Sequence, residues 1–149
     1  SKINVLHKSV FILGAGGVVS SIIFSLLSMG CKKIYLTNRT IDRAENIKKK
    51  FDEVEILKWG EIPDFDIVIN ATSVGLKGDS LDLVLNVKDK IFYDVIYNPK
   101  ETQFLKEAKK NGNKIENGKF MFIYQANQSF SIWNNVIPKI DDEVLKILG

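Results

Sequence analysis

Near its start the chain reads Ser9-Val10-Phe11-Ile12-Leu13-Gly14-Ala15-Gly16-Gly17, an apolar run that ends in a cluster of glycines. The run does not alternate between apolar and polar residues, which is typical of a strand buried on both faces of a parallel sheet. After the glycines, apolar residues recur at intervals of three and four, so residues 18–29 are predicted to form a helix that ends at Gly30. This stretch therefore predicts a strand, a glycine turn and a helix in succession.

Strands and helices continue to alternate along the rest of the chain. Further strands are predicted at residues 34–37, 54–57, 67–69, 91–95 and 114–116, and further helices at 41–51, 102–111, 118–135 and 141–148. Residues 73–90 are less regular and predict a loop. This alternation favours a doubly wound α/β fold with about six parallel strands and helices on both faces. Ligands of such sheets bind where the strand order reverses, so the loops at 14–17 and 70–75 are expected to meet there.

Length and composition indicate one ordinary globular domain. The chain has 149 residues, 45% hydrophobic and 26% charged, and its net charge of +3 comes from scattered lysines that we interpret as solvated surface. We therefore expect no nucleic-acid partner. No apolar run approaches the roughly 20 residues of a membrane span. The single cysteine, Cys31, excludes an internal disulfide framework and a cysteine-rich metal site, and it favours the reducing cytoplasm.

The first residues bear on whether the chain is a piece of a longer protein. The first residue is Ser1 rather than Met, and residues 2–8 look helical and lead straight into the buried strand. We therefore expect that the chain was cut from a longer protein. The only histidine, His7, has no partner in the sequence that would make it a base, and we interpret it as structural or incidental.

The glycine cluster has the composition of a loop that cradles a pyrophosphate. Such a loop needs glycines so that the backbone can turn tightly and approach the phosphates, with helix N–H groups aimed at the anion. Gly14, Gly16 and Gly17 meet this need. The third site of the G-x-G-x-x-G/A pattern is Val19, where a small residue is usual, so the match is imperfect.

The residues after the second predicted strand indicate which dinucleotide is bound. A carboxylate at this place binds the ribose 2′-hydroxyl of NAD, whereas a cation accommodates the 2′-phosphate of NADP. The chain has Asn38-Arg39-Thr40 here, and no carboxylate appears before Asp42. Arg39 can clamp a phosphate or stack on adenine, and Thr40 can also cap the following helix. NADP is therefore the predicted cofactor.

Taken together, these residues resemble the C-terminal NADP-binding domain of the shikimate dehydrogenase family, from about Lys8 onward. Five motifs of that family occur in order. They are the glycine loop at 14–17, N-R-T-x-x-R-A at 38–44, N-A-T-S-x-G at 70–75, D-x-x-Y-x-P-x-x-T-x-x-L at 94–105, and an ending at 118–133 similar to G-x-x-M-L-x-x-Q-A-x-x-x-F-x-x-W. After the glycines this chain departs from the family's small residues and arginine, with Val18-Val19-Ser20-Ser21.

The resemblance implies NADP-dependent, reversible reduction of 3-dehydroshikimate to shikimate, a step of aromatic amino-acid biosynthesis. It also implies roles for individual residues. The implied cofactor-binding residues are Gly14, Ala15, Gly16, Gly17, Asn38, Arg39, Thr40, Arg43, Thr72, Ser73, Gly118 and Met121, and the implied substrate-binding residues are Tyr97 and Gln125. The family's catalytic lysine and aspartate belong to an N-terminal substrate domain whose motifs do not occur in this chain. The resemblance therefore implies that residues 1–149 are a single NADP-binding domain, the C-terminal part of a two-domain enzyme. No catalytic residue and no metal are therefore expected here.

Two other functions fit part of the pattern. The NADP-binding part of a glutamyl-tRNA reductase shares the glycine loop and the N-R-T-x-x-R-A stretch, but it should lack the motifs at 70–75 and 94–105. A non-catalytic nucleotide-binding module would keep the glycine loop without substrate contacts, which Tyr97 and Gln125 argue against. The choice between shikimate and quinate, the strictness of NADP over NAD and the oligomeric state stay open.

Overall fold

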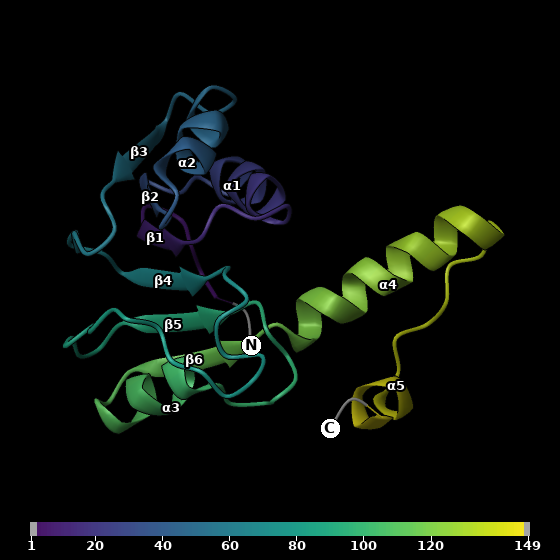
Figure 1. Ribbon diagram of the computed structural model, residues 1–149. Helices are drawn as coiled ribbons and strands as arrows, with labels where there is room; N and C mark the ends of the chain where they lie inside the picture. Colours follow the sequence, from purple (N-terminus) through teal and green to yellow (C-terminus); the bar gives the residue numbers. More distant parts are fainter. Residues whose placement is uncertain (1–2, 148–149) are drawn as a thin grey trace.

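Strand β1 (Ser9–Leu13) lies in the middle of the sheet in the computed structural model, which describes residues 3–147 (Figure 1). The six strands run in the order β3-β2-β1-β4-β5-β6, and every neighbouring pair is parallel. The other strands are β2 (Lys33–Thr37), β3 (Val54–Leu57), β4 (Ile67–Asn70), β5 (Ile91–Asp94) and β6 (Lys114–Asn117). This order confirms the predicted doubly wound sheet.

Each face of the sheet is covered by helices, because β1 is apolar on both sides. Val10 and Ile12 pack on one face with α1 (Val19–Ser28) and α2 (Ile41–Lys48). Phe11 and Leu13 pack on the other with α3 (Gln103–Lys110) and with the extended segment 81–87. All four of these β1 side chains have no solvent exposure, as the unbroken apolar run predicts.

The strand order reverses between β1 and β4. The loops that follow these two strands leave the sheet at the edge formed by the carboxyl ends of the strands. The 14–17 loop leaves β1 there, and residues 71–75 leave β4. The two loops touch, since a Cβ on Gly14 would lie only 2.9 Å from the Ala71 carbonyl oxygen. The expected meeting of these loops is confirmed.

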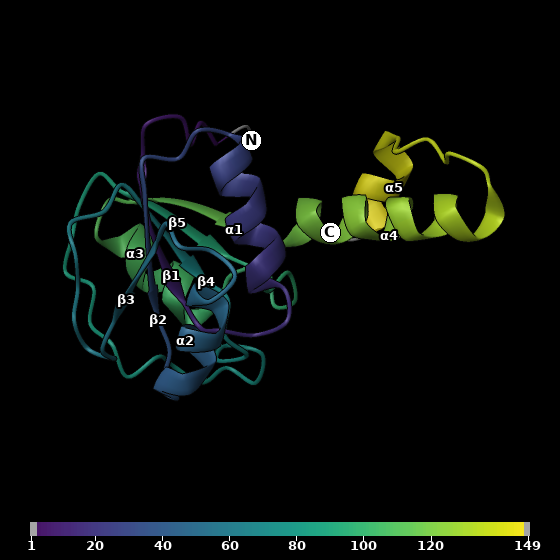
Figure 2. The same cartoon turned by 90° about the horizontal axis from the view of Figure 1, so that it is seen from above.

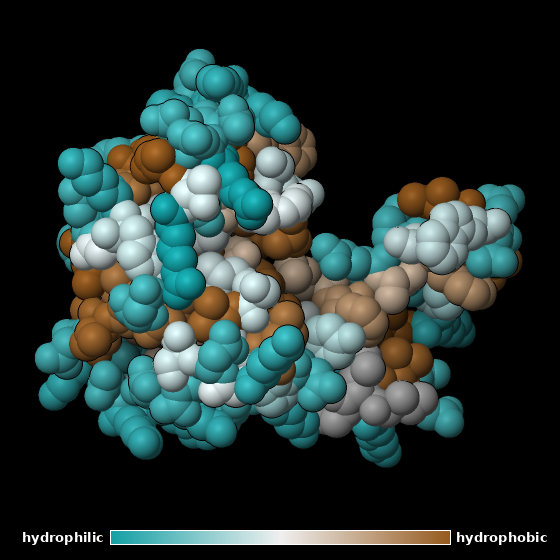
Figure 3. Space-filling model, in the orientation of Figure 1, coloured by the Kyte–Doolittle hydropathy of each residue, from teal (hydrophilic) through white to brown (hydrophobic). Residues whose placement is uncertain are grey.

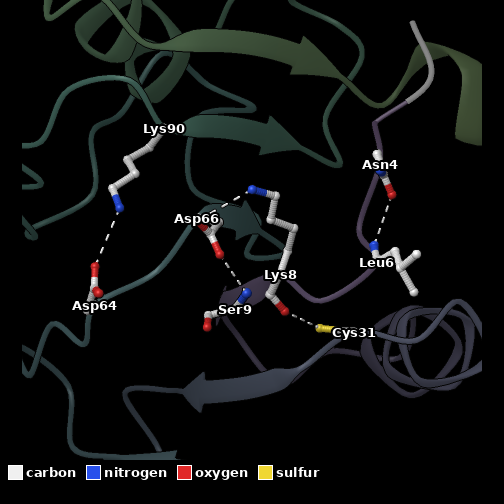
Figure 4. Close-up of polar contacts among 8 residues, drawn as sticks. All are labelled: Asn4, Leu6, Lys8, Ser9, Cys31, Asp64, Asp66 and Lys90. Atoms are coloured by element: carbon white, nitrogen blue, oxygen red, sulfur yellow. Dashed lines mark hydrogen bonds and ion pairs between the residues drawn. The ribbon is translucent and has the colours of Figure 1, made fainter.

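The opposite edge of the sheet is held by polar contacts that surround the start of β1 (Figure 4). Asp66 accepts a hydrogen bond from the Ser9 N–H at 2.9 Å and lies 3.8 Å from the Lys8 ammonium. The Cys31 thiol donates to the Lys8 carbonyl at 3.1 Å. These contacts fix where β1 enters the sheet and lie away from the glycine loop.

Two helices follow the sheet and project from it as an arm. Helix α4 (Lys119–Asn134) extends away from the sheet in both views, and Figure 2 shows α5 (Asp142–Ile147) beside it. The Asn127 amide donates to the Pro138 carbonyl at 2.8 Å, which ties the connection back onto α4. Of the helices in residues 3–147, none is both long enough and apolar enough to cross a membrane.

Two local expectations are wrong. Residues 3–8 form no helix, because His7 turns the chain with a left-handed φ of 58°. The second helix ends at Lys48 rather than at residue 51, since the chain turns there to enter β3. The helices expected at 118–135 and 141–148 are found as α4 and α5, and residue 148 lies outside the described residues.

Candidate functional site

A cavity of about 730 Å³ lies at the edge of the sheet where β1, β4 and β5 end. Its walls come from the glycine loop, the loop after β2, the loop after β4 and the turn after β5. The residues that line it are Gly14, Ala15, Gly16, Gly17, Val18, Asn38, Arg43, Ala71, Thr72, Ser73, Leu76, Val95, Ile96, Tyr97 and Asn98. Arg43 is the only residue with a permanently charged side chain among these described lining residues.

The glycines of the loop serve two different purposes. Gly14 has a φ of +102°, and a Cβ there would come within 2.9 Å of the Ala71 carbonyl oxygen, so the fold itself requires glycine. A Cβ on Gly17 would meet nothing within 4 Å. Gly17 therefore leaves open space over the start of α1, where a ligand can approach the backbone.

The start of α1 lacks the partners that usually satisfy a helix N-terminus. Val18 at the N-cap position gives no side-chain hydrogen bond, and no acidic residue lies in the first turn. Within residues 3–147, the N–H groups of Gly16, Gly17 and Val18 have no hydrogen-bond acceptor. In contrast, the Thr102 side chain caps α3 by accepting from the Leu105 N–H. Unsatisfied N–H groups at a helix start attract an anion such as a phosphate.

Val19, at the imperfect third position of the glycine pattern, has a structural explanation. Its side chain has no solvent exposure and packs in the core beneath α1. The valine side chain therefore packs in the core and not in the cavity. The cavity lining includes Val18 but not Val19.

The two arginines that follow β2 are placed differently, one in the loop and one on α2. Asn38 accepts from the Ala15 N–H at 3.1 Å and donates to the Thr40 carbonyl at 2.7 Å, which joins this loop to the glycine loop. Arg43, on the first turn of α2, lines the cavity. Arg39 does not, because its guanidinium pairs with Asp82 at 3.0 Å. Thr40 occupies the N-cap position of α2 without a side-chain cap bond and also lies outside the lining.

A buried polar network holds the loop after β4 in place. Asn70 accepts from both the N–H and the hydroxyl of Thr72, at 3.1 and 2.7 Å, and its amide donates to Asp94 at 3.1 Å. Asp94 also accepts from the Thr102 hydroxyl at 2.6 Å and from the Ile96 N–H at 3.0 Å. Burial raises the pKa of Asp94 above its ordinary value, although these three hydrogen bonds oppose the shift.

The sequence does not predict this network, although its members lie in the motifs at 70–75 and 94–105. The pattern shows polar residues at the ends of two strands, but not that they face each other in the core. The network explains why Thr72 and Ser73 lie on the cavity wall, since it fixes the turn that carries them.

The implied substrate residues are not brought together. Tyr97 lines the cavity, and its ring stacks on Phe122 of α4 with centroids 4.4 Å apart. Met121 and Gln125 line a second cavity of about 510 Å³ between α1 and α4, and Val18 borders both cavities.

Gly118 is buried and lies outside both linings. A Cβ on Gly118 would lie far too close to the Val95 carbonyl oxygen, so close packing against the end of β5 explains this glycine.

The family model for shikimate / quinate 5-dehydrogenase matches residues 1–78. A shikimate dehydrogenase (NADP(+)) from Pelagibacter ubique (strain HTCC1062) is 55% identical over 149 residues, which cover 97% of this chain and 56% of that protein. The chain thus spans about half the length of the curated relatives it matches.

Solved structures are similar over the same extent. A shikimate dehydrogenase in complex with NADP+ has a TM-score of 0.77 and 37% identity, covering 97% of this chain and 54% of that one. A shikimate 5-dehydrogenase from Listeria monocytogenes, in complex with shikimate and NAD, has a TM-score of 0.83 and 28% identity, covering 97% and 57%. With a family model that matches more than half of its residues and a sheet of the same architecture, the chain belongs to the shikimate/quinate 5-dehydrogenase family.

Proposed function

We propose that the chain is the NADP-binding half of a shikimate dehydrogenase, which reversibly reduces 3-dehydroshikimate to shikimate. The observation that carries this proposal is the uncapped start of α1 beneath the open backbone of Gly17, with Arg43 on the same cavity wall. Family membership favours this function over the glutamyl-tRNA reductase alternative.

The residues present fit a dinucleotide. The cavity volume of about 730 Å³ lies within the usual range for small-molecule and cofactor sites. The free N–H groups of Gly16, Gly17 and Val18 would hold the pyrophosphate, and Arg43 with Asn38 would face the adenosine 2′-phosphate. Thr72 and Ser73 would border the cofactor from the loop after β4.

When bound, NADPH supplies the hydride, and the residues of this chain orient the reactants. Tyr97 lies on the cavity wall, and its stacking on Phe122 restricts the ring. Its hydroxyl would hold the substrate against the cofactor, which gives the orientation that hydride transfer needs. The acid and base would come from the rest of the protein, as the family resemblance implies.

We also propose that the rest of the protein covers helix α4. Ile123 is the only buried residue of this 16-residue helix, while Ile132 and Trp133 are 71% and 81% exposed. Figure 3 shows hydrophobic residues on the arm that α4 and α5 form. Large apolar side chains exposed together on one arm mark an interaction surface, so this arm would pack against the substrate-binding half. Gln125 would then reach the substrate, and Gly118 and Met121 would border the nicotinamide, from the base of the same helix.

A chimera tests the proposed function. In it, this chain replaces the matching segment of the Pelagibacter relative, and the product is assayed for NADP-dependent oxidation of shikimate. We expect turnover that is lost when Gly17→Asp places a carboxylate where the pyrophosphate would bind. A folded chimera that binds NADPH but oxidises no shikimate would contradict the dehydrogenase function and favour a non-catalytic nucleotide-binding module. Quinate, assayed alongside shikimate, decides between the two substrates.

A further inference from the structure

Three loops converge on the side chain of Arg39, just outside the cavity. Arg39 follows β2, Trp59 follows β3, and Asp82 lies in the segment between β4 and β5. The Arg39 guanidinium lies 3.0 Å from the Asp82 carboxylate and 5.5 Å from the centroid of the Trp59 ring. The Trp59 indole N–H also donates to Asp82, at 3.2 Å. Arg39 is therefore held by a carboxylate and an aromatic ring together.

The Asp82 carboxylate is held in this place by its neighbours. Residues 81–87 alternate between half-buried and exposed positions, although they form no strand. Leu81 and Leu83 pack against the core on the α3 side of the sheet, so Asp82 between them points outward. The carboxylate therefore faces Arg39.

We propose that Asp82 is a specificity-determining residue that occupies, in the free protein, the place of the cofactor's 2′-phosphate at Arg39. This inference rests on the proposed NADP-binding function. Arg39 lies outside the cavity lining while Asn38 and Arg43 lie within it, and the pair with Asp82 accounts for that difference. A guanidinium binds a carboxylate and a phosphate through the same planar set of N–H donors, so the two anions compete for it.

The Arg39–Asp82 ion pair is exposed to solvent, so a 2′-phosphate can replace the Asp82 carboxylate at Arg39. The side chains of Arg39 and Asp82 are 56% and 65% exposed, and ion pairs this exposed are weak. NADPH would displace Asp82 and then keep a carboxylate near its 2′-phosphate, where the like charges repel. NADH has no 2′-phosphate and would leave the pair intact. Asp82 thus reduces the preference for NADPH over NADH, while Trp59 keeps the guanidinium in position.

The test compares Asp82→Asn with Asp52→Asn, which removes an equal charge from an exposed side chain ahead of β3, at the opposite edge of the sheet. Both variants carry Trp133→Phe, so that Trp59 becomes the only tryptophan and its fluorescence reports binding. We expect Asp82→Asn to bind NADPH roughly two- to fivefold more tightly, the range set by an exposed ion pair, with NADH affinity unchanged. Asp52→Asn should change neither affinity by as much as twofold.

Three other outcomes would overturn the assignment. Unchanged or weaker NADPH binding by Asp82→Asn would show that the carboxylate does not compete with the phosphate. Equal tightening by Asp52→Asn would show that only net charge matters. If the parent Trp133→Phe chain bound no NADPH, the proposed function would fail and this assignment with it, a result distinct from the first two, in which the parent binds.

Discussion

Gly14 and Gly17 lie in one loop, but glycine is needed at the two positions for different reasons. Gly14 combines a positive φ with close contact to Ala71, so its conformation and its surroundings both exclude a side chain. Gly17 leads into α1 with open space above it. The sequence shows both as glycines of one motif, and only the three-dimensional contacts separate the requirement of the fold from that of the ligand.

Substitutions at these two glycines should separate stability from binding. Gly14→Ala should lower the free energy of unfolding by at least about 1–2 kcal/mol, because alanine disfavours positive φ and the Cβ would press on Ala71. Gly17→Asp should leave stability unchanged or raise it by up to about 1 kcal/mol, since a carboxylate suits a helix N-terminus. It should nevertheless weaken NADPH binding at least about tenfold by occupying the anion site. Urea unfolding and calorimetric titration measure the two effects, and a Gly17→Asp chain that still binds NADPH normally would refute this division.

Arg43 provides a second test at the scale of one residue. Arg43→Gln removes the cation from the cavity wall and should weaken NADPH binding by roughly tenfold or more, as expected for a charge-assisted hydrogen bond. NADH binding should change little because NADH lacks the 2′-phosphate. Lys50→Gln, just past the other end of α2, is the matched control for net charge. An equal loss of both cofactors would argue against contact between Arg43 and the 2′-phosphate.

At the scale of secondary structure, periodicity predicts most elements and says little about polar partners. The buried run in β1 and the apolar spacing in α1 depend on neighbours close in sequence, so the pattern is sufficient. The position of Asp94 depends on Asn70 and Thr102, which are 24 and 8 residues away, and no local pattern contains that pairing. Which of the two arginines lines the cavity likewise depends on a distant residue. Arg39 is held outside the cavity by Asp82, which is 43 residues away.

Tyr93 in strand β5 is expected to make the stability of the fold depend on pH in the alkaline range. Burial, with smaller effects from Glu116 and Asp94, raises the pKa of Tyr93 to about 12. The neutral phenol is favoured in the folded state, so its contribution to stability is full below the unfolded pKa of about 10 and is lost as the pH rises towards 12. In an absorbance titration of tyrosinate, Tyr93→Phe should remove a component that titrates near pH 12. Loss of a component near the ordinary tyrosine value instead would contradict the burial of this hydroxyl.

At the scale of the whole molecule, the sheet and its ligand edge follow from the sequence, but the direction of α4 does not. The predicted helix is present, yet it leaves the sheet at Gly118 and turns Met121 and Gln125 towards α1. That direction depends on the close approach of Gly118 to Val95, a contact between distant parts of the chain.

The exposed arm predicts that the 149-residue chain self-associates as its concentration rises. Trp133 and Ile137 are 81% and 84% exposed, and replacing both with glutamate should reduce association without changing the circular dichroism spectrum. Val84→Glu is the control, because Val84 is also 81% exposed but lies in the segment between β4 and β5. Sedimentation velocity distinguishes these cases. The prediction is wrong if the control reduces association as much as the double variant does.

The proposed function requires that the glycine loop at the start of α1 binds the pyrophosphate of NADPH. A titration of the ¹⁵N-labelled chain with NADPH, followed through its backbone amide resonances, measures this contact. We expect the largest shifts on Gly16, Gly17 and Val18, whose N–H groups have no acceptor among the described residues. Saturating NADPH without shifts in this loop, or with its largest shifts in the cavity between α1 and α4, would contradict it.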